Sequence, residues 1–273
     1  MDDRETTLQL ATVLGVTVSA SELDPLFEIA PELIEWSINS AADARGVLRT
    51  SAWTRDHARA AAVIARVAPE LTSVRERLLD DGDFEGLGLA SRGAGAATLR
   101  WWTLAGDGAA MADRARTAWP EHAAAIDRLL AAAGGASTCA AAGLESGAHS
   151  RQTIYARLRD PAAAIRVLEL AGVPTSQPAS LFWKGICGLE PGGRDWPQVW
   201  VGHSHGRGGG WKFYYFARGD ELRRTDAVLL DAVRATPVLA RACEVVGGPC
   251  IQLIGLTIRP SEDPAFTVYL ARR

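Results

Sequence analysis

Residues 33–53 read LIEWSINSAADARGVLRTSAW, which is two runs of alternating residues joined by a short polar stretch. Alternation with a period of two is typical of a strand with one buried face, and Ala-Asp falls where a hairpin turn is expected. The arrangement recurs at a spacing of roughly 50 to 60 residues, which indicates an array of similar units. Its further copies are at 84–106, 138–159, 198–218 and 250–272.

Stretches rich in Ala, Leu and Arg separate these strand pairs and have the spacing of amphipathic helices. They cover 55–79, 108–133, 161–172 and 220–246, and a further helix is expected over about 5–30. The sequence therefore predicts five strand-strand-helix repeats in a single domain, residues 1–273. Residues 174–197 break the period, and we interpret them as a loop or lid.

Alignment of the five pairs places two sets of residues in register. The second strands align Arg49, Arg100, Tyr155, Tyr214 and Tyr269. The first strands align Glu35, Gly88, Gly143, Gly202 and Gly255. Every separation between the two columns is even, so both columns face the same side of the sheet.

The parity of the strands distinguishes a buried face from a wet one. Residues beside the second column, such as Trp101, Ile154 and Phe213, are nearly all apolar and suit packing under helices. Trp36 shares that parity and is expected under a helix. The opposite face of the sheet, which carries the two aligned columns, is cationic and aromatic. Closing ten antiparallel strands into a barrel removes the exposed edges and turns this face into a lumen. Because buried unpaired charges are costly, the lumen must hold water or an anionic ligand.

Composition excludes several classes of protein. The chain is 48% hydrophobic and 22% charged, which is typical of a globular protein with a core and not of a disordered chain. The net charge of −3 disfavours nucleic acid as a partner. The four cysteines form no CxxC pair, and the first residues form no signal segment. We therefore expect a reduced cytoplasmic protein with no membrane partner.

Three segments resemble the ABBA aromatic prenyltransferases, the PT-barrel family. Residues 34–39 with Leu48-Arg49 are similar to the glutamate-then-arginine element of the dimethylallyltryptophan synthases and the cyanobactin-type peptide prenyltransferases. Residues 142–160 resemble the peptide-modifying branch, which has a basic residue in place of Thr153 and a histidine in place of Tyr155. Residues 255–260 are close to the phenol and naphthalene branch. The resemblance covers nearly the whole chain and implies an α+β PT barrel, with ten antiparallel strands around a solvent-accessible lumen and an outer ring of helices.

The resemblance also implies roles for the residues of the lumen. Arg forks suit phosphate oxygen atoms, and aromatic faces stabilise a cation. The diphosphate is expected to contact Arg49, Arg100, Arg157, Lys212, Tyr155, Tyr214 and Tyr269. The carbocation shield or acceptor pocket is expected to include Trp102, Thr153 and Phe216, with the three tyrosines also able to shield the cation. Glu35 is the candidate general base. Its alternative role is a structural ion pair with Arg49. Glu145 is the other acidic residue with lumenal parity and is therefore the rival candidate for the base.

By the same resemblance, the chain is expected to transfer a dimethylallyl or longer group from a prenyl diphosphate to a nucleophilic side chain of a peptide natural product. Free tryptophan or another indole, or a phenolic small molecule, is the alternative acceptor. A non-catalytic barrel that binds an anionic ligand is the alternative from another class. The one candidate cofactor is Mg²⁺ bound through the diphosphate, since the sequence shows no metal site formed by the protein itself.

The five histidines fit no metal site. His203 and His205 have the parity opposite to the lumen, and no third ligand stands at a useful spacing. His57, His122 and His149 fall in expected helices or a turn. We therefore expect His203 and His205 on the surface or under a helix, and the other three in solvent.

Overall fold

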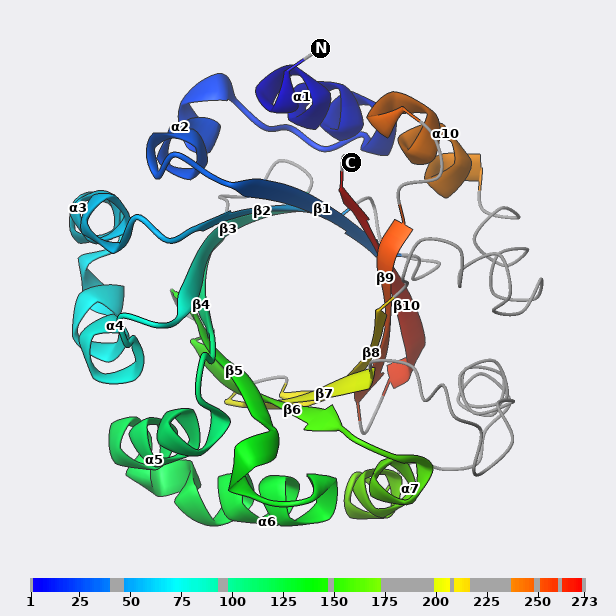
Figure 1. Ribbon diagram of the computed structural model, residues 1–273. Helices are drawn as coiled ribbons and strands as arrows, with labels where there is room; N and C mark the ends of the chain where they lie inside the picture. The colour runs from blue at the N-terminus through cyan, green and yellow to red at the C-terminus, as the bar shows by residue number, and fades with distance from the viewer. Residues whose placement is uncertain are drawn as a thin grey trace.

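Ten antiparallel strands close into a barrel in this computed structural model, which describes residues 2–39, 47–92, 98–146, 150–172, 199–206, 209–216, 237–247, 251–259 and 262–271. Each strand pairs with its neighbours in the chain, and β1 closes the barrel against β10 (Figure 1). The strands are β1 (Leu33–Asn39), β2 (Val47–Thr54), β3 (Phe84–Arg92), β4 (Thr98–Leu104), β5 (Cys139–Glu145), β6 (Arg151–Leu158), β7 (Val199–His205), β8 (Gly210–Phe216), β9 (Ile251–Arg259) and β10 (Glu262–Ala271). The predicted fold class is confirmed.

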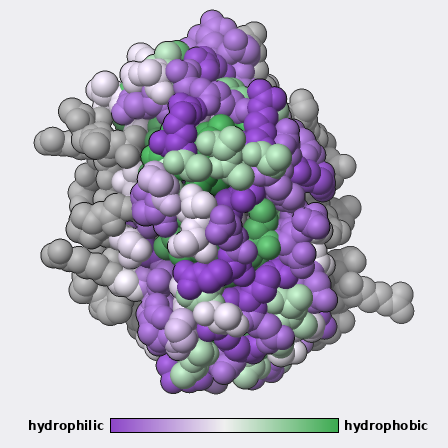
Figure 2. Space-filling model, turned by 90° about the vertical axis from the view of Figure 1, so that its left-hand side faces the viewer, coloured by the Kyte–Doolittle hydropathy of each residue, from purple (hydrophilic) through white to green (hydrophobic). Residues whose placement is uncertain are grey.

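Helices surround the barrel on its outside, as Figure 1 shows. Those of the described residues are α1 (Asp3–Leu14), α2 (Ala20–Glu28), α3 (His57–Val67), α4 (Thr72–Leu78), α5 (Gly108–Ala118), α6 (Ala123–Ala133), α7 (Pro161–Leu170) and α10 (Pro237–Val246), with short 3-10 turns η1 (Pro69–Leu71), η2 (Pro120–His122) and η3 (Ala136–Thr138). Figure 2 shows one side of the molecule, the left-hand side of Figure 1, and the surface of that side is chiefly hydrophilic. Among the described residues, no helix has the length and apolar character needed to span a membrane.

Three helices that the sequence predicts as continuous are each two helices. Gly15 ends α1 in the left-handed region, with φ of 63°, and Ser19 begins α2 with a capping box to Glu22. Pro69 and Pro120 open the 3-10 turns that divide the other two, because proline lacks the N–H that would continue a helix. Of the predicted helix 220–246, only 237–246 lies within the described residues, and the proposed lid at 174–197 lies outside them.

The core lies between the barrel wall and the helices. Trp36, Trp101, Ile154 and Phe213 are fully buried there, as the parity of their strands predicts. The indole Nε1 of Trp36 donates to Thr7 of α1 at 2.8 Å. This arrangement fixes the orientation of every strand, because a shift of one residue would exchange the buried and lumenal faces.

Two of the histidines expected in solvent take part in contacts with the barrel wall. His57 lies 2.9 Å from the buried carboxylate of Glu85, which also accepts two hydrogen bonds from Arg75. The ring of His122 stacks on His205 with centroids 4.3 Å apart. A sequence pattern does not reveal such contacts, because they join residues from distant elements. His149 lies outside the described residues.

Candidate active site

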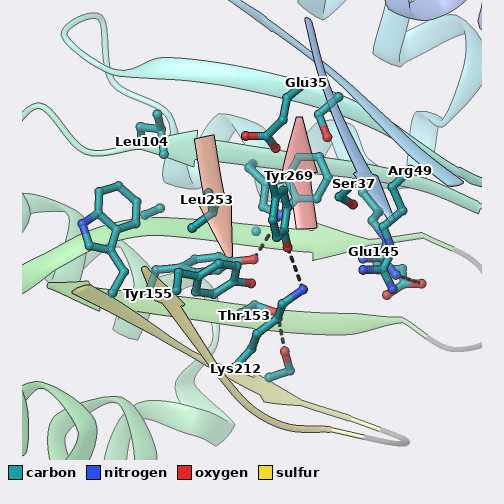
Figure 3. Close-up of a pocket in the computed structure, with 18 of the residues that line it drawn as sticks. Glu35, Ser37, Arg49, Leu104, Glu145, Thr153, Tyr155, Lys212, Leu253 and Tyr269 are labelled. Atoms are coloured by element: carbon teal, nitrogen blue, oxygen red, sulfur yellow. Dashed lines mark hydrogen bonds and ion pairs between the residues drawn. The ribbon is translucent and has the colours of Figure 1, made fainter. Parts of the chain in front are cut away.

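The barrel encloses a cavity of about 290 Å³ that runs along its axis. Its hairpin end is where the two strands of each pair are joined, and its helix end is where the strands lead to the helices. In Figure 3, Arg49 and Glu145 lie toward one side and Leu104 toward the other, with Tyr155, Lys212 and Tyr269 between them. The cavity therefore changes from charged at the hairpin end to apolar at the helix end.

The aligned glycines make room for the large side chains of the cavity. A Cβ atom on Gly88 would lie 2.5 Å from the indole of Trp102, and one on Gly202 would lie 2.9 Å from the ring of Tyr155. A Cβ atom on Gly255 would lie 2.6 Å from Cε of Lys212. None of these glycines has a positive φ, so it is space and not backbone conformation that requires them. The glycine column is thus the counterpart of the aromatic and cationic one.

Guanidinium groups gather at the hairpin end. Arg49 and Arg100 are each the third residue of their strand, and Arg151 opens β6. The Nε atoms of Arg49 and Arg100 are buried and have no hydrogen-bond partner among the described residues. Burial, and then the nearby charge of Arg100, lowers the pKa of Arg49 to about 10. Buried cationic donors without partners suit an anionic ligand with several oxygen atoms.

Glu145 is engaged by two of these arginines. Arg100 donates to Oε1 at 2.8 Å, and Arg151 donates to Oε2 at 3.0 Å. Burial alone would raise the pKa of Glu145, but the two arginines outweigh it and the net direction is down. The carboxylate thus stays ionised and aligns the guanidinium planes. Glu145 is a poor proton acceptor for this reason, although its lumenal position made it the rival base.

Three tyrosines form the middle of the cavity. The rings of Tyr155 and Tyr214 have centroids 5.7 Å apart, and those of Tyr214 and Tyr269 have centroids 6.0 Å apart. Trp102 donates through Nε1 to the hydroxyl of Tyr155 at 3.2 Å, and Lys212 donates to the hydroxyl of Tyr269 at 2.6 Å. Burial is the largest influence on all three hydroxyls and raises each pKa, so they remain protonated. The layer offers both hydroxyl donors and π faces.

Glu35 of β1 faces the cavity opposite Lys212 and next to Tyr269 (Figure 3). Burial raises the pKa of its carboxyl to about 7, with a smaller opposing effect from Lys212. None of the ion pairs among the described residues includes Glu35, so the structural pair with Arg49 is not formed there. A carboxyl that titrates near neutral pH can accept a proton in a reaction and release it to water afterwards.

The helix end is lined by aromatic rings. Trp53 stacks on Trp102 with centroids 6.0 Å apart and on Phe84 with centroids 5.8 Å apart. Trp200 and Leu104 also line this end. Sequence reasoning missed Trp53, Phe84 and Trp200, although each has the parity of the lumen. Following the columns to the strand ends would have found them.

The predicted residues fall into three groups in the structure. Those that line the cavity are Glu35, Arg49, Arg100, Trp102, Thr153, Tyr155, Lys212, Tyr214 and Tyr269. Thr153 there shares a hydrogen bond of 2.8 Å with Ser204. Arg157 is exposed at the helix end and does not line the cavity, whereas Arg151, which was not assigned to the diphosphate, does. The side chain of Phe216 lies outside the described ones.

The described residues offer no site for a resident metal. No cluster of His, Cys, Asp and Glu able to hold a metal ion is found in the parts of the chain that the structure describes. Among those residues the cavity is lined by four cations, Arg49, Arg100, Arg151 and Lys212, and by two carboxylates, those of Glu35 and Glu145. The surplus of positive charge favours an anion.

Comparison with known proteins identifies the fold. No family model and no curated protein matches the sequence. Among solved structures, the prenyltransferase PriB in its apo form has a TM-score of 0.74 at 16% identity, with 98% of this chain and 94% of PriB covered. For 5-dimethylallyltryptophan synthase from Streptomyces coelicolor the TM-score is 0.71 at 18% identity, with 98% and 95% covered. For 6-dimethylallyltryptophan synthase from Micromonospora olivasterospora, in complex with DMASPP and Trp, it is 0.73 at 16% identity, with the same coverage. The barrel is therefore the PT barrel of the aromatic prenyltransferases.

Proposed function

We propose that this chain is an aromatic prenyltransferase, which moves a prenyl group from a prenyl diphosphate to the indole of tryptophan or a related aromatic compound. The observation that carries the proposal is the order of groups along one cavity. Buried arginines with unused donors come first, then three phenol rings, then a carboxyl with a raised pKa beside an aromatic surface. These groups suit, in the same order, the three steps of a prenyl transfer: departure of the diphosphate, stabilisation of the allylic cation and loss of a proton.

The diphosphate of the donor is assigned to the hairpin end. Arg49, Arg100 and Arg151 offer guanidinium forks there, and Thr153 with Ser204 adds hydroxyl groups. Charge-assisted hydrogen bonds stabilise the leaving diphosphate as its bond to the first prenyl carbon breaks and it takes the electron pair. Any Mg²⁺ would be held by the diphosphate, since both oxygen atoms of Glu145 already accept hydrogen bonds from arginines.

The tyrosine layer is assigned to the allylic cation. The faces of Tyr155, Tyr214 and Tyr269 surround the centre of the cavity, and a cation over such a face gains about 0.5–2 kcal/mol. The aromatic surface of Trp102 continues this shield toward the helix end. Rings that stabilise the cation also exclude water, which would otherwise capture it.

Glu35 is assigned as the general base. The π electrons of the acceptor form the new carbon–carbon bond to the cation, and the adduct then loses a proton to the carboxylate of Glu35. The products are the prenylated acceptor and diphosphate. A pKa of about 7 leaves a large fraction of this group ionised at neutral pH.

A small indole suits the helix end better than the peptide that the sequence analysis placed first. The stacked rings of Trp53, Phe84 and Trp102 present flat surfaces of the kind that an indole packs against. Two of the solved structures that the barrel resembles are named as dimethylallyltryptophan synthases. The segment 174–197, which the sequence analysis interprets as a loop or lid, lies outside the described residues.

Incubation of the purified chain with dimethylallyl diphosphate and L-tryptophan tests the proposal. We expect tryptophan to gain the mass of one prenyl group, with Trp-containing cyclic peptides and phenols converted more slowly. Geranyl diphosphate is the second donor to include. Binding of diphosphate without product from any acceptor would instead favour a non-catalytic anion-binding barrel.

A further inference from the structure

Glu145 places a negative charge among the cations at the hairpin end of the cavity. It pairs in register with Arg100 of β4 on one side and with Arg151 of β6 on the other. Nη2 of Arg100 lies 2.8 Å from its Oε1, and Nε and Nη2 of Arg151 each lie 3.0 Å from its Oε2. The side chain of Glu145 is only 12% exposed, so little water competes for these contacts. A carboxylate of the chain thus occupies N–H donors of the site to which the diphosphate is assigned.

Other donors of the same site have no such partner. The Nε atoms of Arg49 and Arg100 are buried without a hydrogen-bond partner among the described residues. A diphosphate therefore meets two kinds of donor, the unpartnered Nε atoms and those for which it competes with Glu145. Because Glu145 belongs to the chain, its effective concentration at these donors is high whenever the anion begins to leave.

The cations of the cavity pose a problem for the end of the reaction. Among the described residues, four of them line the cavity, Arg49, Arg100, Arg151 and Lys212. The leaving diphosphate takes the electron pair of the broken bond and gains one negative charge, so these cations attract it more strongly than the donor it came from. Slow release of a product can set the rate of an enzyme. A negative charge that competes for the same N–H groups opposes this retention.

We infer that Glu145 weakens the hold of the site on diphosphate and thereby speeds release of this product. The inference rests on the proposed function, which places the diphosphate beside Arg100 and Arg151. As the diphosphate departs, the carboxylate of Glu145 reoccupies the donors of these two arginines. Alignment of the guanidinium planes by Glu145 acts in the opposite sense and favours anion binding. The sign of the change in affinity on removing the carboxylate therefore separates the two effects.

Calorimetry with inorganic phosphate, diphosphate and triphosphate tests the inference in Glu145→Gln. Gln has nearly the shape of Glu without its charge, so the room in the cavity stays the same. Divalent cations are left out of the buffer because they would mask the charge of the anions. We expect E145Q to bind diphosphate about tenfold more tightly, with a smaller gain for phosphate and a larger one for triphosphate, because electrostatic energy grows with the charge of the anion. Inhibition of prenyl transfer by added diphosphate should strengthen by a similar factor.

Two further variants complete the experiment. Glu145→Asp keeps the charge and should show a smaller gain than E145Q for every anion. Glu121→Gln is the matched control, because Glu121 lies in η2 outside the barrel, where its Oε1 accepts from Nε2 of Gln152, the neighbour of Arg151 in β6. It removes a carboxylate that contacts none of the cavity cations in the described ion pairs, and it should leave all three affinities unchanged.

Weaker or unchanged binding of diphosphate in E145Q, or an equal gain for all three anions, would overturn the inference. These affinities are measured without turnover. Failure of the wild-type chain to form any prenylated product would therefore contradict the transferase, while the three binding constants would still decide the role of Glu145.

Discussion

Arg100 and Glu145 lie opposite each other on neighbouring strands, with Nη2 of the arginine 2.8 Å from Oε1 of the carboxylate. This ion pair is the reason that the two carboxyl groups of the lumen differ in pKa. The arginines hold the pKa of Glu145 down against the effect of its burial, whereas burial raises the pKa of Glu35 to about 7. Two carboxyl groups in one cavity thus titrate in different pH ranges, which divides the roles of anchor and base between them.

Replacement of Glu35 by Gln should abolish most of the turnover and retain donor binding, because the amide cannot accept the proton. In the wild type, kcat/KM should fall about tenfold per pH unit below about pH 7, where the carboxyl becomes protonated. The residual activity of E35Q should lack this acidic limb. Rates measured from acidic to weakly alkaline pH with saturating donor check the expectation.

Glu145→Gln is the comparison for that experiment. It removes a carboxylate from the same cavity but leaves the proton acceptor in place, so its acidic limb should persist whatever happens to its rate. A limb that disappears in E145Q and persists in E35Q would transfer the role of base to Glu145.

Arg49→Met should change donor affinity and stability in opposite directions. Arg49 is half-buried and its Nε atom is buried without a partner, so its loss removes an unfavourably placed charge, and the free energy of unfolding of the ligand-free protein should rise by about 1–3 kcal/mol. The affinity for inorganic diphosphate should fall about tenfold to a hundredfold with the loss of charge-assisted bonds. Urea unfolding and calorimetry measure the two quantities. Unchanged diphosphate affinity would remove Arg49 from the donor site.

The alternation of residues was enough to predict the barrel and most of the lumen. One parity rule separated Trp36 and Trp101, which are buried under helices, from Glu35 and Arg100, which line the cavity. A strand gives this information because its side chains alternate between two faces. The face of the sheet on which each strand residue lies could therefore be predicted from the sequence without knowing its position along the barrel axis.

Position along the axis was not readable from parity. Arg157 was grouped with Arg49 because both have the lumenal parity, yet it is exposed near the helix end of β6 and does not line the cavity, whereas Arg151 lies with Arg49 at the charged end. The tilt and stagger of barrel strands decide which inward residues share a level, and loop lengths alone do not give them. Contacts between distant elements were missed for a similar reason, as the buried Arg75 and Glu85 pair shows.

Gly88→Ala should displace Trp102, since the new Cβ atom would lie 2.5 Å and 2.6 Å from two atoms of the indole ring. On the other side, Gly143 also packs against that ring, so the indole has little room to move. We expect prenyl transfer to fall at least tenfold and the protein to lose about 1–3 kcal/mol of stability through overpacking. Product formation and thermal unfolding report the two effects.

A second substitution tests whether the ring itself causes these losses. Trp102→Phe in the Gly88→Ala background replaces the indole by a smaller ring and should recover part of the stability. Gly82→Ala is the control, because no atom lies within 4 Å of a Cβ atom built there. If Gly82→Ala and Gly88→Ala behaved alike, the glycine column would not be explained by the space it provides.

The imidazoles on the outer wall of the barrel should make stability depend on pH. His205 stacks on His122, and its ring centre lies 4.2 Å from that of His203, which in turn stacks on Trp211 at 3.9 Å. Burial is the main cause that lowers the pKa of His203 and of His205 to about 4, helped by the neighbouring histidines and Arg128. The unfolded chain therefore binds more protons than the folded one between pH 6.5 and about 4.

Stability should thus fall as the pH drops through that window, by about 1–3 kcal/mol for the partly exposed pair. His205→Phe keeps a stacked ring without a titrating group, so its free energy of unfolding should depend less steeply on pH. The raised pKa of Glu35 acts in the opposite sense, since its protonated form favours the folded state at low pH, but this contribution cancels in the difference between the variant and the wild type. Urea unfolding at several pH values between about 7 and 5 measures the slopes. Parallel slopes for the two proteins would mean that His205 is not the group that titrates.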